Sequence, residues 1–78
     1  MNIKDWYIKK YPEDEMGKQL NARVGIKECW QMMKNGNDFY TIVNGADSIV
    51  RERVFSEIAR IHGIDYDVVY DVWLNNEA

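Results

Sequence analysis

The large apolar side chains of this chain recur at helical spacing, in short stretches that proline and glycine residues separate. The clearest stretch contains Ile26, Cys29, Trp30 and Met33, placed at i, i+3, i+4 and i+7. No stretch shows the sustained apolar–polar alternation of a strand. A chain of 78 residues is also too short for a second domain. We therefore predict a single all-α domain over residues 1–78, folded as a compact bundle of four to five helices.

Local signals in the first half of the chain predict where helices begin and end. Asn2 is suited to cap a helix over roughly residues 3–10. Pro12 interrupts that helix and suits the first turn of a short one over about residues 13–20. A further helix is expected to begin near Ile26 and to stop at an Asn-Gly pair, residues 35–36.

The second half of the chain contains the best helical pattern. Asn37 or Asp38 is expected to cap a short turn that ends at residues 44–45, and Asp47 or Ser48 a long helix that ends at Gly63. A last helix is expected to run from a cap at Asp65 to Asn75 and Asn76, with Val68, Val69, Val72 and Trp73 facing inward. The predicted core of the domain is Trp6, Trp30, Met33, Ile42, Val50, Val54, Phe55, Ile58, Ile61, Val69, Val72 and Trp73.

Residues 59–72 have the spacing of a helix-turn-helix-like pair. Ala59 provides the small side chain that a close helix crossing requires, and Gly63 provides the positive φ of the turn. Ile64, Val69 and Val72 would bury the second helix against the first. A plain helical hairpin shares part of this pattern and remains an alternative.

The charge of the second helix of this pair argues against the usual function of the motif. In DNA-binding proteins of this type, the residues at positions 65, 66, 67, 70 and 71 would face the major groove. Here these residues are Asp65, Tyr66, Asp67, Tyr70 and Asp71. Bases are read chiefly by Arg, Lys, Asn and Gln, and phosphates attract positive charge. Residues 35–78 contain three Arg and eight acidic residues, with no Lys or Arg after Arg60.

Two interpretations of this acidic helix remain open. Asp65 and Asp67 favour a helix N-terminus, so the face could be solvated surface only. Alternatively, Tyr66, Asp67, Tyr70 and Asp71 form a protein-binding surface, because tyrosine is common at interfaces and carboxylates complement basic partners. Arg51 and Arg53 are a candidate second patch for a carboxylate or phosphate group, unless they only pair within their helix. A DNA-binding regulator would need them, with Arg60, near the acidic helix.

No motif for catalysis, a cofactor or a metal ion is present. His62, the single histidine, suits the C-terminal end of its helix, and Cys29 falls on an apolar face as a small buried side chain. Glu13, Asp14 and Glu15 are explained as acids in a first helical turn. The N-terminus carries charges within its first five residues and no apolar run reaches membrane-spanning length, so we expect neither a signal peptide nor a membrane span and favour the cytoplasm.

Two segments and the last helix resemble small unassigned proteins that bacteriophages and mobile elements of bacteria encode. The segments are Asp5-Trp6-Tyr7 through Leu20-Asn21, with Tyr11-Pro12, and Asp47 through Ala59; the helix contributes Asp65-Tyr66-Asp67 and Trp73-Leu74. The resemblance implies a genomic setting and no catalytic residues. Short proteins of this setting often bind a host protein. The resulting hypothesis is a non-enzymatic protein-interaction module, without a cofactor, that binds a bacterial host or phage protein. The alternative is a small helix-turn-helix DNA-binding regulator.

Overall fold

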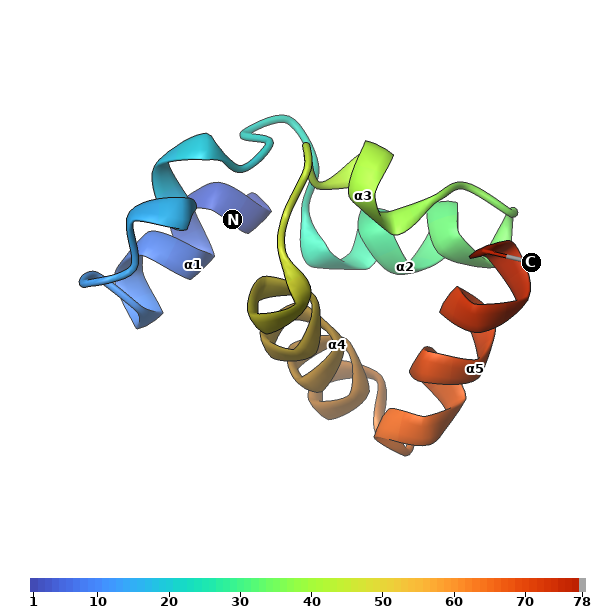
Figure 1. Ribbon diagram of the computed structural model, residues 1–78. Coiled ribbons are helices and arrows are strands. Elements are labelled where there is room, and N and C mark those ends of the chain that lie inside the picture. Colours follow the sequence, from blue (N-terminus) through green and yellow to red (C-terminus); the bar gives the residue numbers. More distant parts are fainter. Residues whose placement is uncertain (78) are drawn as a thin grey trace.

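The computed structural model describes the backbone of residues 1–77 and the side chains of residues 1–76 (Figure 1). In this range the chain forms five α-helices and one 3-10 helix, and no strand. The elements are α1 (Ile3–Lys10), η1 (Glu15–Gln19), α2 (Ile26–Lys34), α3 (Phe39–Ile42), α4 (Ser48–His62) and α5 (Tyr66–Glu77). The prediction of an all-α bundle of four to five helices is confirmed.

Helix α4 connects the two sides of the molecule. In Figure 1, α1 and η1 lie on one side of α4 and α5 lies on the other. Helix α4 packs against α5 and α2, while α2 also contacts α3 and α5. The long helix therefore holds side chains that reach in opposite directions, toward α1 and toward α5.

The core lies where the inner face of α4 meets α2, α3 and α5. Phe55 of α4 meets Phe39 of α3 edge to face, with 5.0 Å between the ring centroids. Val69 is the fully buried side chain of α5. The predicted core is confirmed for its members that are buried, which are Trp30, Met33, Ile42, Val50, Val54, Phe55, Ile58 and Val69.

Four predicted core residues are only partly buried: Trp6, Ile61, Val72 and Trp73. On α1, the neighbouring Tyr7 is fully buried while Trp6 is not, because the Tyr7 ring packs against Gly17 and its hydroxyl donates to Asp14. Val68 was also expected to face inward, but 46% of it is exposed. It is about 100° around the helix from Val69, and Val69 occupies the inward position.

The segment after Pro12 differs from the prediction of an α-helix over residues 13–20. Pro12 lies in a turn, and a short 3-10 helix begins after Asp14, whose carboxylate accepts a hydrogen bond from the Met16 N–H at 2.9 Å. Gly17 allows this segment to approach α1 closely, since a Cβ there would lie 3.0 Å from Ile8 Cγ1. The tertiary contact with α1 determines this geometry.

The predicted stop at Asn75 and Asn76 is wrong, because α5 continues to Glu77. The side chain of Asn76 points back to α2 and donates a 2.6 Å hydrogen bond to the carbonyl oxygen of Met33. The helix end is thus tied to a neighbour that sequence spacing does not reveal. The caps expected at Asn2, Asp38 and Asp47 and the end at Gly63 are confirmed.

Candidate protein-binding surface

Helix α5 has an inner side that joins it to α4 and an outer side that faces solvent. The inner side carries Val69 and the partly buried rings of Tyr66, Tyr70 and Trp73. The outer side carries Asp67, Val68, Asp71 and Leu74, all exposed. We call these four residues the α5 outer face. Val68 and Leu74 are 46% and 44% exposed, so aliphatic and carboxylate groups alternate along this face.

The two predicted tyrosines stand at the border between the inner and outer sides. Tyr66 and Tyr70 stack on each other with ring centroids 6.1 Å apart. Tyr66 also meets Phe55 of α4 at 6.2 Å, and Tyr70 meets Trp73 at 5.3 Å. Burial raises the pKa of Tyr66, and the nearby carboxylate of Glu52 adds to that effect. The tyrosines therefore orient α5 against α4 and leave only part of their surface open.

The carboxylates of this region have no positive partner among the described side chains. Asp65, Asp67 and Asp71 are exposed and form neither an ion pair nor a side-chain hydrogen bond within residues 1–76. Glu52 of α4 adds a fourth exposed acid near Tyr66. A surface of this kind has a negative potential, because none of these carboxylates is neutralised by an ion pair within residues 1–76.

Arg51 is held in the junction of α3, α4 and α5. Its guanidinium carbon lies 4.1 Å from the ring centroid of Trp73, and its Nη1 donates a 2.7 Å hydrogen bond to the hydroxyl of Tyr40. Its Nε and the indole Nε1 of Trp73 are buried without a hydrogen-bond partner in the described structure. Arg51 thus lies beside α5 with most of its donors turned into the protein.

Arg53 points to the opposite side of α4, toward α1 and η1. Its guanidinium stacks on Tyr11 at 4.1 Å, and its Nη1 donates to the Tyr7 hydroxyl at 2.7 Å and to the Asp14 carboxylate at 2.9 Å. The Tyr7 hydroxyl in turn donates to Asp14. This hydrogen bond is the main cause that holds the pKa of Asp14 below its usual range, with the Met16 N–H and Arg53 contributing.

Arg60 forms a third, separate contact. Its Nε and Nη2 donate to the two carboxylate oxygens of Glu57 at 2.7 and 2.8 Å. Glu57 therefore pairs with Arg60 of its own helix, whereas Arg53 pairs with Asp14. The three arginines therefore contact three different parts of the fold, and Arg51 and Arg53 do not lie together as a patch.

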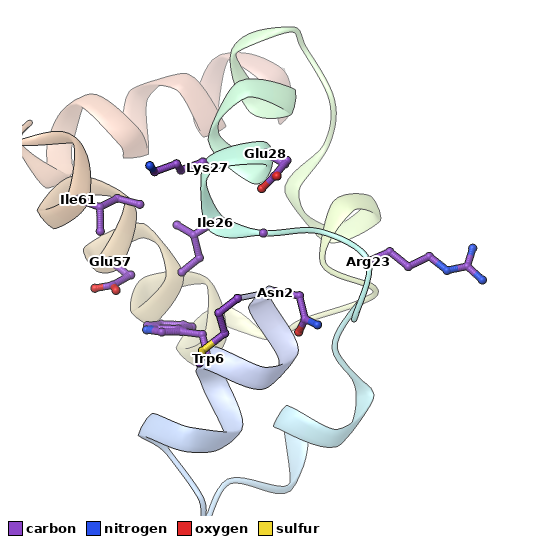
Figure 2. A pocket seen from close by; sticks show the side chains of 10 residues that line it. Asn2, Trp6, Arg23, Ile26, Lys27, Glu28, Glu57 and Ile61 are labelled. Atoms are coloured by element: carbon purple, nitrogen blue, oxygen red, sulfur yellow. The ribbon is translucent and has the colours of Figure 1, made fainter.

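A pocket on the other side of α4 was not anticipated from the sequence. It has a volume of about 560 Å³, and its apolar lining comes from Trp6 of α1, Ile26 of α2 and Ile61 of α4, with Met1 and the side chain of Glu57 beside them. Figure 2 shows the side chains of Trp6, Ile26 and Ile61 pointing toward one another from separate helices. Its apolar residues come from three separate helices, so no local sequence pattern indicates it.

Two further kinds of functional feature are a metal site and a membrane-spanning helix. Among the described residues, no group of three or more His, Cys, Asp or Glu side chains is arranged to hold a metal ion. None of the helices in residues 1–77 has both the length and the apolar character needed to cross a membrane.

Comparison of the chain with protein-family models, with curated proteins and with solved structures found no match. A function for this chain therefore has to be argued from its own surface.

Proposed function

We propose that this chain is a non-enzymatic protein-interaction module whose α5 outer face binds a positively charged surface of a bacterial host or phage protein. One observation carries the proposal. Along the outer side of α5, the unpaired carboxylates of Asp67 and Asp71 lie among the exposed aliphatic side chains of Val68 and Leu74.

The spacing of these residues suits the docking of a helix into a groove. Asp67, Asp71 and Leu74 follow one another at i, i+4 and i+7, which places them on one line along α5. Aliphatic side chains contribute the desolvated centre of such a contact, and carboxylates steer the approach of a basic partner. Tyr66 and Tyr70 would border the contact, each with part of its ring open.

We assign a structural role to Arg51 and Arg53, which stabilise the packing of the helices around the α5 outer face. Arg51 ties α4 to α5 through Trp73, and Arg53 ties α4 to α1 through Tyr7 and Asp14. A bacteriophage or mobile-element origin is part of the proposal and rests on the sequence resemblance alone.

The alternative, binding of duplex DNA through α5, has less support. It would bring Asp67 and Asp71 into a groove lined by phosphates, with repulsion that nearby cations would have to offset. Only Arg51 lies next to α5, while Arg53 and Arg60 are paired with Asp14 and Glu57. The distribution of charge therefore favours a protein partner.

Affinity capture with charge-reversed variants tests the proposal. Tagged wild-type protein and an Asp67→Lys/Asp71→Lys variant are used to capture proteins from bacterial lysate, and bound proteins are compared by mass spectrometry. The matched control is Glu13→Lys/Glu15→Lys, which changes net charge equally on the exposed segment next to α1. A specific partner lost with the first variant and kept with the control is expected. Identical capture by all three proteins would refute a role for the α5 outer face.

A salt titration separates the DNA alternative. Fluorescence anisotropy with labelled duplex DNA at low ionic strength should give no binding. Binding that weakens steeply as salt rises would support the alternative instead. Salt dependence is the better readout here, because Arg51→Ala and Arg53→Ala also remove contacts that hold the fold.

A further inference from the structure

The pocket between α1, α2 and α4 has an apolar lining and a positively charged edge. Lys27 lines it from the start of α2, and Arg23 lines it from the preceding loop. Both are exposed and unpaired among the described residues. The ammonium of Lys10 lies 5.8 Å from the ring centroid of Trp6. In Figure 2, Arg23 extends outward from the edge of the pocket, away from the apolar lining.

The acidic groups of this pocket leave its charge positive. Glu57 is buried and its carboxylate is neutralised by Arg60. Glu28 is the one exposed acid that lines the pocket. Against it stand Arg23 and Lys27, which both line the pocket. The N-terminal end of α2 also lies here, and the Glu28 carboxylate lies against it, since a Cβ built at Gly25 would clash with Glu28 Oε2. The helix N-terminus therefore offsets part of the negative charge of Glu28.

The α5 outer face is the complement of this pocket in both charge and apolar character. It presents carboxylates at Asp67 and Asp71 and an aliphatic side chain at Leu74. It lies on α5, and Figure 1 places α5 on the opposite side of α4 from α1. The two surfaces of one molecule therefore cannot meet each other, but they can meet in two molecules.

We infer that the α5 outer face of one copy docks into the pocket of a second copy, with Leu74 against Trp6, Ile26 and Ile61 and the carboxylates against Lys27 and Arg23. This contact joins two different surfaces, so it leaves a free pocket at one end and a free α5 at the other. Such head-to-tail contacts extend into chains unless the rotation closes a ring. The inference rests on the proposed docking role of the α5 outer face.

The contact involves one helix face and one small pocket, so it should be weak and sensitive to salt. Sedimentation velocity and light scattering at low ionic strength, with protein on the order of 0.1–1 mM, should show a mean mass that rises with concentration above the monomer mass of 9.2 kDa. At roughly 0.5 M salt the mean mass should return toward the monomer. A monomer at every concentration and salt would overturn the inference.

Two charge variants and their mixture give the decisive test. The α5 variant is Asp67→Lys/Asp71→Lys and keeps its pocket, while the pocket variant is Arg23→Glu/Lys27→Glu and keeps its α5. All four residues are exposed. Each variant alone should be monomeric. Their equimolar mixture should associate again, because two of the four pairings are complementary in charge: the unchanged α5 with the unchanged pocket, and the lysine-bearing α5 with the glutamate-bearing pocket. A mixture that stays monomeric, or a variant that still associates alone, would overturn the head-to-tail contact.

Leu74→Ala tests the apolar part of the contact without a change in charge. It should weaken association by roughly tenfold, and an unchanged concentration dependence would contradict the placement of Leu74 in the pocket. Circular dichroism of each variant confirms that it is folded.

The test of self-association and the test of the proposed function can fail independently of each other. The pocket variant should still capture the host or phage partner, because its α5 outer face is intact. If wild-type protein is monomeric while only the α5 variant loses that partner, the self-association inference fails and the proposed function stands. If the variants and their mixture associate as expected but all variants capture the same proteins, the proposed function fails and the self-association inference stands.

Discussion

The guanidinium of Arg51 on α4 lies over the indole of Trp73 on α5, with its carbon 4.1 Å from the ring centroid. The same guanidinium donates a 2.7 Å hydrogen bond to the hydroxyl of Tyr40 on α3. One side chain thus joins three helices. Because the α5 outer face depends on how α5 sits on α4, this contact contributes to positioning the proposed site.

Replacing Arg51 by alanine should destabilise the fold. The cation–π contact and the hydrogen bond to Tyr40 are both lost, and their typical contributions add up to about 1–3 kcal/mol in the free energy of unfolding. Urea unfolding followed by circular dichroism measures the change. Arg51→Lys is the control, because it keeps the charge but not the planar group that stacks on Trp73. It should restore less than half of the loss, and a wild-type midpoint for Arg51→Ala would contradict the assignment.

The contact of Asp14 with Tyr7 and Arg53 should make the fold sensitive to acid. The hydrogen bond from Tyr7 is the first cause that lowers the pKa of Asp14 in the folded protein. A carboxyl with a lowered folded pKa contributes stability that is complete above its unfolded pKa of about 4 and is lost as the pH falls through the folded pKa.

Asp14→Asn isolates this contribution. Its free energy of unfolding should be lower than that of the wild type at neutral pH, and the two should converge below about pH 4. Chemical unfolding at a series of pH values measures both curves. Glu57 also has a lowered pKa, first through its hydrogen bonds with Arg60. The loss of stability that Glu57 causes at acid pH should therefore be the same in the wild type and the variant. A constant difference at all pH values would show that the charge of Asp14 is not involved.

Tyr7 gives a second pH dependence, at the alkaline end. Burial, together with its hydrogen bond to Asp14, raises the pKa of Tyr7 to about 12. A raised folded pKa contributes stability that is complete below the unfolded pKa of about 10 and is lost as the pH rises toward the folded value. Tyr7→Phe should therefore be less stable than the wild type at neutral pH and should lose less stability between about pH 10 and pH 12. Equal losses over that range would contradict the burial of this hydroxyl.

Much of the fold follows from local chemistry that the sequence displays. Asn2, Asp38 and Asp47 accept hydrogen bonds from backbone N–H groups of the helices that they precede, and Gly63 adopts a positive φ after α4. Each of these helix caps and stops involves residues within a few positions of one another. Helix starts and stops of this kind are predictable because the physics is local.

The wrong predictions concern positions whose structure depends on contacts between residues that are far apart in the sequence. Trp6 stays partly exposed because η1 packs on its neighbour Tyr7, and Asn76 does not stop α5 but donates to the carbonyl oxygen of Met33 of α2. The same holds for the candidate site. Helical spacing places Asp67 and Asp71 outward, but the partners of Arg51 and Arg53 are 11 to 46 positions away in the chain, so no local pattern indicates them.

Cys29 should be nearly inert in the folded protein. Its side chain is fully buried, and burial raises the pKa of its thiol to about 12. Since the thiolate is the reactive form, alkylation at neutral pH should be slower than in the unfolded chain by at least roughly a hundredfold. The rate of iodoacetamide labelling with and without denaturant, followed by mass spectrometry, measures this. Similar rates in both conditions would place Cys29 at the surface.

The connection from α4 to α5 turns on Gly63. Its φ is 64°, in the left-handed region, and a Cβ built there would meet no atom within 4 Å. The Gly63 N–H points to the carbonyl oxygen of Arg60 at 3.4 Å, and the Ile64 N–H donates to that of Ala59 at 3.1 Å. These two bonds close the end of α4 in the Schellman arrangement.

Gly63→Ala should therefore lower stability through backbone strain alone. The left-handed conformation costs an L-residue about 1–2 kcal/mol, and no steric clash adds to this cost at the open site. Gly63→Asn is the matched control, because asparagine tolerates this conformation better, and it should recover part of the loss. Thermal and urea unfolding of both variants measure the difference. Equal destabilisation by alanine and asparagine would mean that a contact rather than φ is responsible, and the orientation of α5 would then need another origin.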